Sequence, residues 1–217
     1  MMVVNGMKQC GVEMKKFEKF WFNENKKYWL KFTAFIRPLV NCVGNLIGFF
    51  IKEKCKTTGK VRLIECDGLK YPSEKDVDIA IKNGDAIISP WISNLIPTVG
   101  RTAIARRLRN AGTKVNEGII TYGAVGTDST PALNSNTQLV NEIFRKLLST
   151  TYNTDNVVRL RVFLTTSQGN GTLREYGLFG EDATGVANSG TLFERVIINK
   201  VKTTAKTLTI ESMITIS

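Results

Sequence analysis

The chain has 217 residues, and its hydrophobic fraction of 42% is that of a globular protein rather than a disordered one. It contains no histidine, which excludes imidazole-dependent catalytic triads and histidine-ligated zinc sites. The net charge of +11 comes from 30 basic and 19 acidic residues, with most of the excess before residue 76. Such a basic segment is compatible with nucleic acid, an anionic membrane, an acidic partner or simply a solvated surface.

The N-terminal region combines aromatic residues with lysines. Residues 12–31 have the spacing of an amphipathic helix and contain Trp21 and Trp29. Aromatic side chains of this kind anchor interfaces, so the helix is expected to pack on a neighbouring subunit, with a membrane surface or the protein core as the alternatives. Residues 32–51, which include Phe35, are long enough to cross a bilayer, but Arg37 and Pro38 interrupt them. We favour a helix buried against a partner subunit and keep a membrane span as the alternative. The first residues lack the features of a signal peptide.

The next elements are short and separated by charged or proline-rich stretches. Residues 52–60 are expected to form a turn and residues 61–66 a short strand, and the stretch from Pro72 to Asp78 is interpreted as a domain boundary. A helix is predicted from Thr98 to about residue 110, with Ile104 and Leu108 on its buried face. This helix carries four arginines that could bind phosphate or be solvated: Arg101, Arg106, Arg107 and Arg109.

The C-terminal half is more regular. A strand at 118–126 and a polar loop at 127–136 are followed by a predicted helix at 137–149, in which Leu139, Ile143 and Leu147 share a face. Four further strands are predicted at 156–166, 171–180, 191–199 and 206–216. The Gly-rich stretch 167–171 has the length of a hairpin turn, and residues 181–190 lie in a meander connection.

The sequence therefore predicts an α+β fold, with an antiparallel meander sheet packed with two helices and a helical, aromatic and basic N-terminal extension. We divide the chain into an interaction arm at 1–75 and a folded domain at 76–217. The four cysteines, Cys10, Cys42, Cys55 and Cys66, match no common zinc spacing, so we interpret them as free thiols in a reducing compartment.

Catalytic patterns are not found in the sequence. It has no phosphate-binding glycine loop and no nucleophile elbow. Glu175 could form a carboxylate pair with Glu142, Glu181 or Asp182, but no spacing selects one of them. Structural pairing of Glu175 is the commoner arrangement, either with an arginine across the hairpin, such as Arg159 or Arg161, or with an exposed backbone group. We therefore expect no enzyme, no cofactor, no metal and no small-molecule substrate.

The order of several motifs resembles a known family. "ITYGAVGTDSTPALNSNTQLVNEIFRKLL", followed by strands and "NGTLREYGLFGE", is similar to tailed-bacteriophage structural proteins, above all the N-terminal domains of tail-collar fibre proteins and also neck and baseplate adaptor proteins. The resemblance covers about residues 95–217. The matching positions are Gly123 to Thr127, Gln138, Leu139, Glu142, Arg145 and Glu175 to Phe179.

This resemblance implies a virion structural protein of the tail or neck, assembled in the host cytoplasm, which binds other phage tail, neck or fibre proteins and forms a symmetric homo-oligomer. The absence of a long fibrous region after the domain favours a short adaptor, collar or fibre-anchoring subunit. The residues expected at structural contacts or interfaces are Trp21, Trp29, Phe35, Glu142, Arg145, Glu175, Gly177, Leu178 and Phe179. A membrane-associated protein anchored by residues 12–51 and a nucleic-acid-binding protein using the arginine cluster remain as alternatives.

Overall fold

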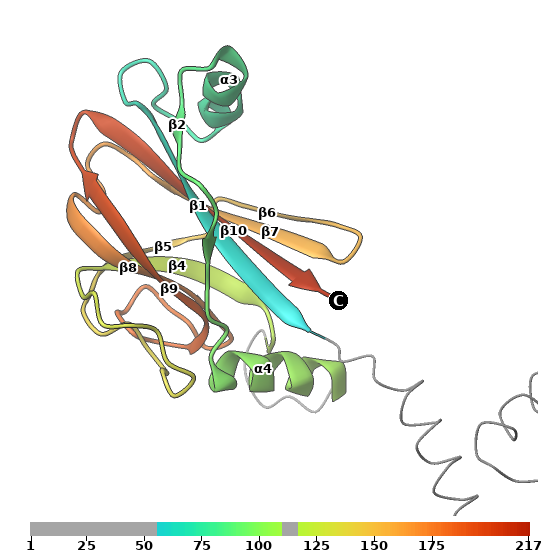
Figure 1. Ribbon diagram of the computed structural model, residues 1–217. Coiled ribbons are helices and arrows are strands. Elements are labelled where there is room, and N and C mark those ends of the chain that lie inside the picture. Colours follow the sequence, from blue (N-terminus) through green and yellow to red (C-terminus); the bar gives the residue numbers. More distant parts are fainter. Residues whose placement is uncertain (1–55, 110–116) are drawn as a thin grey trace, which may run out of the picture. The chain divides into compact units, whose positions relative to one another are not determined.

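The computed structural model describes residues 56–109 and 117–217, which form two antiparallel β-sheets and two helices (Figure 1). In chain order, the elements are β1 (Thr57–Asp67), α3 (Lys75–Asn83), β2 (Ile87–Ile88), β3 (Ile92–Ser93), α4 (Thr98–Arg109), β4 (Ile120–Gly126), β5 (Glu142–Leu147), β6 (Thr150–Thr154), β7 (Val157–Leu164), β8 (Gly171–Gly180), β9 (Thr191–Lys202) and β10 (Lys206–Ile216).

The two sheets differ in size and in how their strands are connected. The larger sheet has the order β2-β1-β10-β7-β6, with the short strand β3 also paired to β1. The smaller sheet has the order β5-β4-β8-β9. β1 and β10 pair along the whole of β1, from Thr57 opposite Ile216 to Asp67 opposite Lys206. Strands from the two ends of the described chain therefore lie side by side in the middle of the larger sheet.

The main hydrophobic core lies between the two sheets. It takes alternate residues from β1, β7 and β10 on one side and from β8 and β9 on the other. In β7, for example, Leu160, Val162 and Leu164 enter this core, as the alternation in the sequence predicts. Such packing of two inner faces is the arrangement of a β-sandwich.

The outer faces of the sheets are covered by other elements. A second cluster joins α3 to the outer face of the larger sheet, where Val77 and Ala80 pack near Ile64 and Phe163. A third cluster lies on the outer face of the smaller sheet and includes Leu139 from the loop between β4 and β5. α4 contacts β9, and Figure 1 shows α3 and α4 beyond opposite ends of the strands.

The predicted α+β class and the antiparallel strands are confirmed, but the single meander is wrong. The stretch 167–171 does not close a hairpin, because β7 pairs with β10 and β6 whereas β8 pairs with β4 and β9. This turn instead carries the chain from one sheet to the other. Its glycines have positive φ values, 58° at Gly169 and 122° at Gly171, a conformation suited equally to a hairpin or to such a corner.

The helix predicted at 137–149 is also wrong, since residues 142–147 form strand β5 along the edge of the smaller sheet. Residues four positions apart share a side in a strand as well as in a helix, so the spacing of Ile143 and Leu147 could not separate the two. Phe144 turns to the main core, while Leu139 is buried from the preceding loop.

The N-terminal side of the domain differs from expectation in two ways. α3 begins within the stretch that was interpreted as a boundary, and Gly84, with a left-handed φ of 75°, caps its C-terminus. β1, assigned to the interaction arm, belongs to the larger sheet, where it pairs with β10. The predicted helix α4 is confirmed, but Leu108 is 84% exposed and Ala103 takes the buried position instead.

Several predictions concern residues outside the described part of the chain, namely the helices at 12–31 and 32–51 with Trp21, Trp29 and Phe35. Within residues 56–109 and 117–217, no helix is long and apolar enough to span a membrane. Cys66 is a free, buried thiol, and its burial raises the pKa of that thiol.

Candidate functional site: two braced loops on the smaller sheet

The outer face of the smaller sheet carries a row of four residues in register. Arg145 of β5 lies opposite Ala124 of β4, Ala124 opposite Gly177 of β8, and Gly177 opposite Arg195 of β9. The two small residues, Ala124 and Gly177, stand between the two arginines in this row. A Cβ added at Gly177 would lie 2.9 Å from Cδ2 of Leu139. The absence of a side chain at Gly177 therefore admits the loop between β4 and β5 onto the sheet.

This first loop, residues 127–141, is held by a buried ion pair. The Nη2 atom of Arg195 lies 2.9 Å from Oε2 of Glu175, and both side chains are fully buried. Glu175 also accepts hydrogen bonds from the backbone N–H groups of Val140 at 3.1 Å and Asn141 at 2.7 Å. The carboxylate therefore fixes the end of the loop to β8.

Arg195 binds the beginning of the same loop. Its guanidinium donates to the carbonyl oxygens of Thr130 at 3.0 Å and Pro131 at 3.2 Å, and to Oδ1 of Asn136 at 3.2 Å. Asp128 lies nearby at 3.9 Å, and its pKa is lowered chiefly by hydrogen bonds from Thr130. Both charges are shielded from water, so each compensates the other. Loss of either partner would leave an uncompensated buried charge and destabilise the fold.

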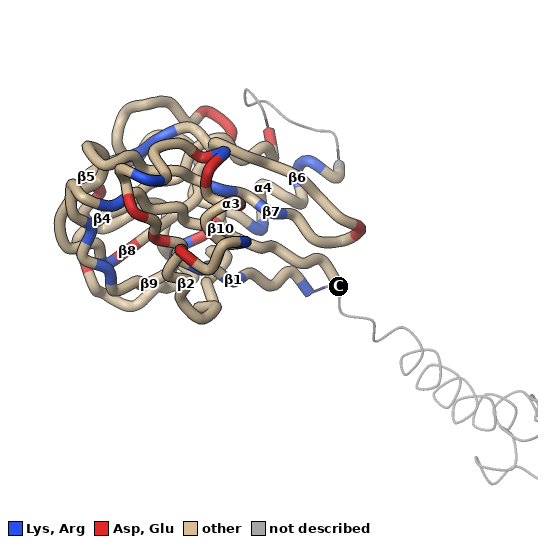
Figure 2. The backbone as a smooth tube through the Cα atoms, turned by 90° about the horizontal axis from the view of Figure 1, so that it is seen from above, with Lys and Arg blue, Asp and Glu red and all other residues tan. Residues whose placement is uncertain are grey.

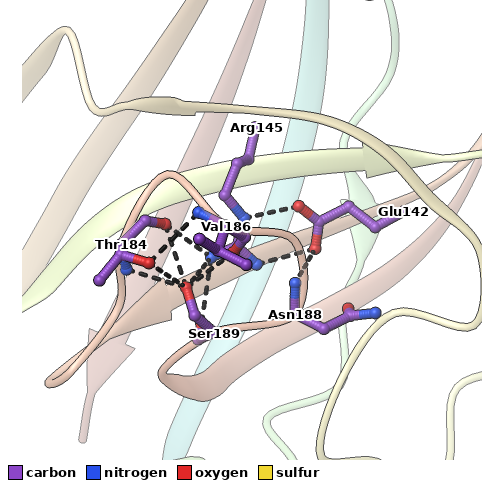
Figure 3. A network of polar contacts seen from close by, with 6 residues as sticks. All are labelled: Glu142, Arg145, Thr184, Val186, Asn188 and Ser189. Atoms are coloured by element: carbon purple, nitrogen blue, oxygen red, sulfur yellow. Dashed lines mark hydrogen bonds and ion pairs between the residues drawn. The ribbon is translucent and has the colours of Figure 1, made fainter.

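The second loop, residues 181–190, is held by the ion pair between Glu142 and Arg145 (Figure 3). The two side chains are almost fully buried, and their atoms lie 2.5 and 2.8 Å apart. Arg145 donates to the carbonyl oxygens of Thr184 and Ser189, while Oε2 of Glu142 accepts the backbone N–H of Asn188 at 2.9 Å. Residues of β5 thus bind the loop that connects β8 to β9.

A third ion pair anchors α4 near the same loop. Nη2 of Arg106 lies 2.7 Å from Oε1 of Glu181, and its Nε lies 2.8 Å from Glu117. Glu181 and then Glu117 raise the pKa of Arg106. Arg101, another member of the arginine cluster, donates to the carbonyl of Ile96 and to Asn134. The guanidinium groups of Arg101 and Arg106 are bound to other groups of the protein. Fewer arginines of the cluster are therefore available to bind phosphate.

The structure brings together most of the residues singled out from the sequence. Glu142, Arg145, Glu175, Gly177 and Phe179 all lie on the outer face of the smaller sheet, where the Arg145 guanidinium stacks 4.4 Å from the Phe179 ring centre. Leu178, in contrast, turns to the main core. Glu175 therefore makes a structural contact, in which it holds the loop 127–141 against β8.

The arginines expected to pair with Glu175 were wrong, although the bonds that it accepts from backbone groups were among the expected alternatives. Arg159 and Arg161 lie in the larger sheet, where both contact the buried carboxylate of Glu211 on the neighbouring strand β10. Arg195 was not identified because its pairing with Glu175 depends on the β8–β9 register. Alternation along the predicted strand could not have placed Arg195, because a bulge at Phe193 interrupts it and turns Phe193 to the main core.

A further buried carboxylate was also missed. Glu194 is fully buried between the sheets, where its Oε1 accepts a hydrogen bond of 2.8 Å from Ser212 of β10, and its Oε2 has no hydrogen-bond partner in the described residues. Burial raises the pKa of Glu194 to about 8, although Ser212 and Asn94 act in the opposite direction. Burial, followed by the charge of Glu194, raises the pKa of Tyr176.

The braced loops and β5 present a surface that is aliphatic and poor in charge, which we call the loop face. Its exposed aliphatic side chains are between 43% and 69% exposed: Leu133, Val140, Ile143, Leu147 and Val186. The charged residues of 127–147 and 181–190 are Asp128, Glu142, Arg145, Lys146, Glu181 and Asp182. Of these six residues, Asp182 alone is exposed, and the other five are buried or half-buried. Elsewhere along the backbone, Figure 2 shows residues of both signs interspersed.

Comparison with protein families identifies the chain. The model of the phage tail-collar fibre protein N-terminal domain matches residues 92–217, which is more than half of the sequence. The protein therefore belongs to this family, and it is a structural protein of a phage tail, located in the tail of the virion. Comparisons with curated proteins and with solved structures gave no match. The matched segment contains α4, both braced loops and every member of their ion pairs.

Proposed function

We propose that this protein is a fibre-anchoring or collar adaptor subunit, which joins other tail, neck or fibre proteins through protein–protein contacts and forms a symmetric homo-oligomer. In this proposal, the loop face is the main contact surface, and assembly takes place in the host cytoplasm. Binding to partners, rather than turnover of a substrate, is the activity that the family and the braced loops support.

The observation that carries this proposal is the combination of rigid bracing and exposed aliphatic side chains. Three ion pairs with largely or fully buried carboxylates fix the two loops and α4, so a partner would meet a preorganised surface. Preorganisation lowers the entropy that binding costs. The central part of a protein interface is depleted of charge, as the loop face is. The chain as a whole carries a net charge of +11, but the loop face is poor in charge. This surface therefore fits a protein partner better than a polyanion, which binds to basic side chains.

The proposal is tested by quantitative mass spectrometry of gradient-purified particles. We expect the protein at a fixed, small copy number set by the symmetry of the tail. Leu133→Asp, which places a charge on the loop face, should lower this copy number. The matched control is Leu69→Asp, because Leu69 is an exposed leucine in the turn after β1 on the other sheet. Absence of the wild-type protein from the particles would refute the proposal, and equal incorporation of both variants would refute the role of the loop face.

A further inference from the structure

A buried lysine lies at the corner where the chain passes from the larger sheet to the smaller one. Lys202, the last residue of β9, is only 2% exposed. Its Nζ atom donates to the carbonyl oxygen of Thr165 at 2.7 Å and to Oδ1 of Asn170 at 2.8 Å. Both acceptors are uncharged, and an ammonium ion held away from water by neutral groups is costly. Burial accordingly lowers the pKa of Lys202, against the opposing effect of the Glu65 charge, and so favours the neutral amine.

The side-chain amide of Asn170 is held at both ends beside this amine. Its Oδ1 accepts from Lys202, and its Nδ2 donates to the carbonyl oxygen of Thr166 at 2.8 Å. The hydrogen bond of 2.8 Å and a C=O length of about 1.23 Å place Nζ of Lys202 at most about 4.0 Å from Cγ of Asn170. Reacting atoms that are well oriented lie about 3–3.5 Å apart. The fold therefore holds an amine nucleophile close to an amide carbon.

A carboxylate faces the same space from the opposite sheet. Glu65 of β1 follows Val61 and Leu63 on the side of the strand that faces the main core. Its side chain is 12% exposed, and its Oε2 lies 2.6 Å from Nζ of Lys200, two residues before Lys202 on β9. The charge of Glu65 also acts on Lys202 itself. A carboxylate in this position can take a proton from an amine and pass it on.

We propose that Lys202 and Asn170 form an isopeptide bond within the folded chain. The Lys202 ammonium gives one proton to Glu65, and the neutral amine attacks Cγ of Asn170, as a desolvated lysine does in covalent catalysis. The Cγ–Nζ bond forms and the Cγ–Nδ2 bond breaks. A second proton of Nζ goes to Nδ2, which leaves as ammonia. Glu65 then returns its proton to the ammonia, so the products are an amide and an ammonium ion, and no oxidant or reductant is required.

The bond would close the hairpin of β8 and β9 at its open end. Gly171, the residue after Asn170, lies opposite Lys202 in the ladder between these strands. The link would therefore enclose β8, the loop 181–190 and β9 in one covalent ring, so that the two strands could not separate from this end. A ring of this kind also restricts the unfolded chain and stabilises the fold. The reaction needs no partner, and it is therefore independent of the proposed function.

Peptide mass spectrometry of the folded, full-length chain tests the bond without any substitution. Trypsin cleaves after lysine and arginine, but not after a lysine whose Nζ belongs to an amide. We expect a branched peptide in which residues 162–174 are joined to residues 201–206, with a mass one ammonia below that of the two segments together. Recovery of the two segments only as separate peptides, with cleavage after Lys202, would overturn the proposal.

Lys202→Arg separates the isopeptide bond from other losses of ammonia. Arginine keeps the positive charge and the donors, but its guanidinium stays protonated and does not attack an amide. Asn170 precedes a glycine and can also lose ammonia by closing on its own backbone, a reaction that does not need Lys202. We expect the branched peptide and the loss of ammonia to be absent from Lys202→Arg. An equal loss of ammonia in the variant and the wild type would overturn the proposal.

Glu65→Gln tests the transfer of the proton. The branched peptide is followed over time after cell-free synthesis of the full-length chain. Glutamine keeps the shape of the side chain but cannot accept the proton, so the bond should form about 100-fold more slowly or not at all. Lys200→Arg is the matched control, because it keeps a cation beside Glu65, and its rate should be that of the wild type. Formation at the wild-type rate in Glu65→Gln would overturn the role of Glu65.

Discussion

Replacement of Glu194 by glutamine is expected to stabilise the protein at neutral pH. The carboxyl group lies in the main core between the sheets, without a basic partner among the described residues, and only its Oε1 atom has a hydrogen bond, from Ser212. Glutamine has nearly the same shape and keeps an oxygen for Ser212. Unlike glutamate, it does not gain a charge when the chain unfolds, so its burial costs the same at every pH.

The magnitude follows from the pKa of Glu194, which is raised from 4.5 in the unfolded chain to about 8 in the fold. Below pH 4.5 the group is neutral in both states and contributes no pH dependence. Between pH 4.5 and 8 the unfolded chain binds fewer protons than the folded one, so stability falls by about 1.4 kcal/mol per pH unit. At pH 7 the accumulated loss is on the order of 3 kcal/mol, and above pH 8 it no longer grows.

The assay is urea denaturation of the wild type and Glu194→Gln at a series of pH values from 5 to 9, followed by circular dichroism. The difference in unfolding free energy should be small at pH 5, grow up to about pH 8 and then level off. Asp155→Asn serves as the control, because it removes one negative charge from an exposed turn. A variant that is no more stable than the wild type at pH 8, or a difference that does not change with pH, would refute the reasoning.

The remaining predictions concern the loop face. Glu175→Gln leaves the buried charge of Arg195 without its partner and should cost about 3–5 kcal/mol in urea denaturation, and a loss below about 1 kcal/mol would contradict the brace. Arg145→Met should speed hydrogen exchange within 181–190, whereas unchanged exchange there would show that the loop is held by other contacts. Gly177→Ala should lower the unfolding free energy by about 1–3 kcal/mol, because its Cβ meets neighbours at 2.9–3.0 Å, and an unchanged thermal midpoint would argue against this close packing.

Local patterns in the sequence were sufficient for most strands and for α4. β8 and β10 were predicted at their observed bounds, and β7 and β9 within a few residues, because alternating side chains and Gly-rich turns are properties of neighbouring residues. The sequence also indicated the family, since the order of motifs around Glu142, Arg145 and Glu175 is itself a linear feature. That resemblance is confirmed over residues 92–217.

The tertiary structure decided what these elements pair with. Spacing could not separate a helix from a strand at 142–147, and only pairing with β4 made it the edge strand β5. The turn at 167–171 could close a hairpin or lead to another sheet, and the choice depends on contacts with β10 and β4.

The ion pairs have the same origin. Glu175 and Arg195 are 20 residues apart and meet because two strands align in one register, while the loop they bind, residues 127–141, comes from elsewhere in the chain. Residue types alone favoured structural pairing of Glu175 over a catalytic role. The long-range register determined its partner, because a buried charge takes whichever opposite charge the fold brings within reach.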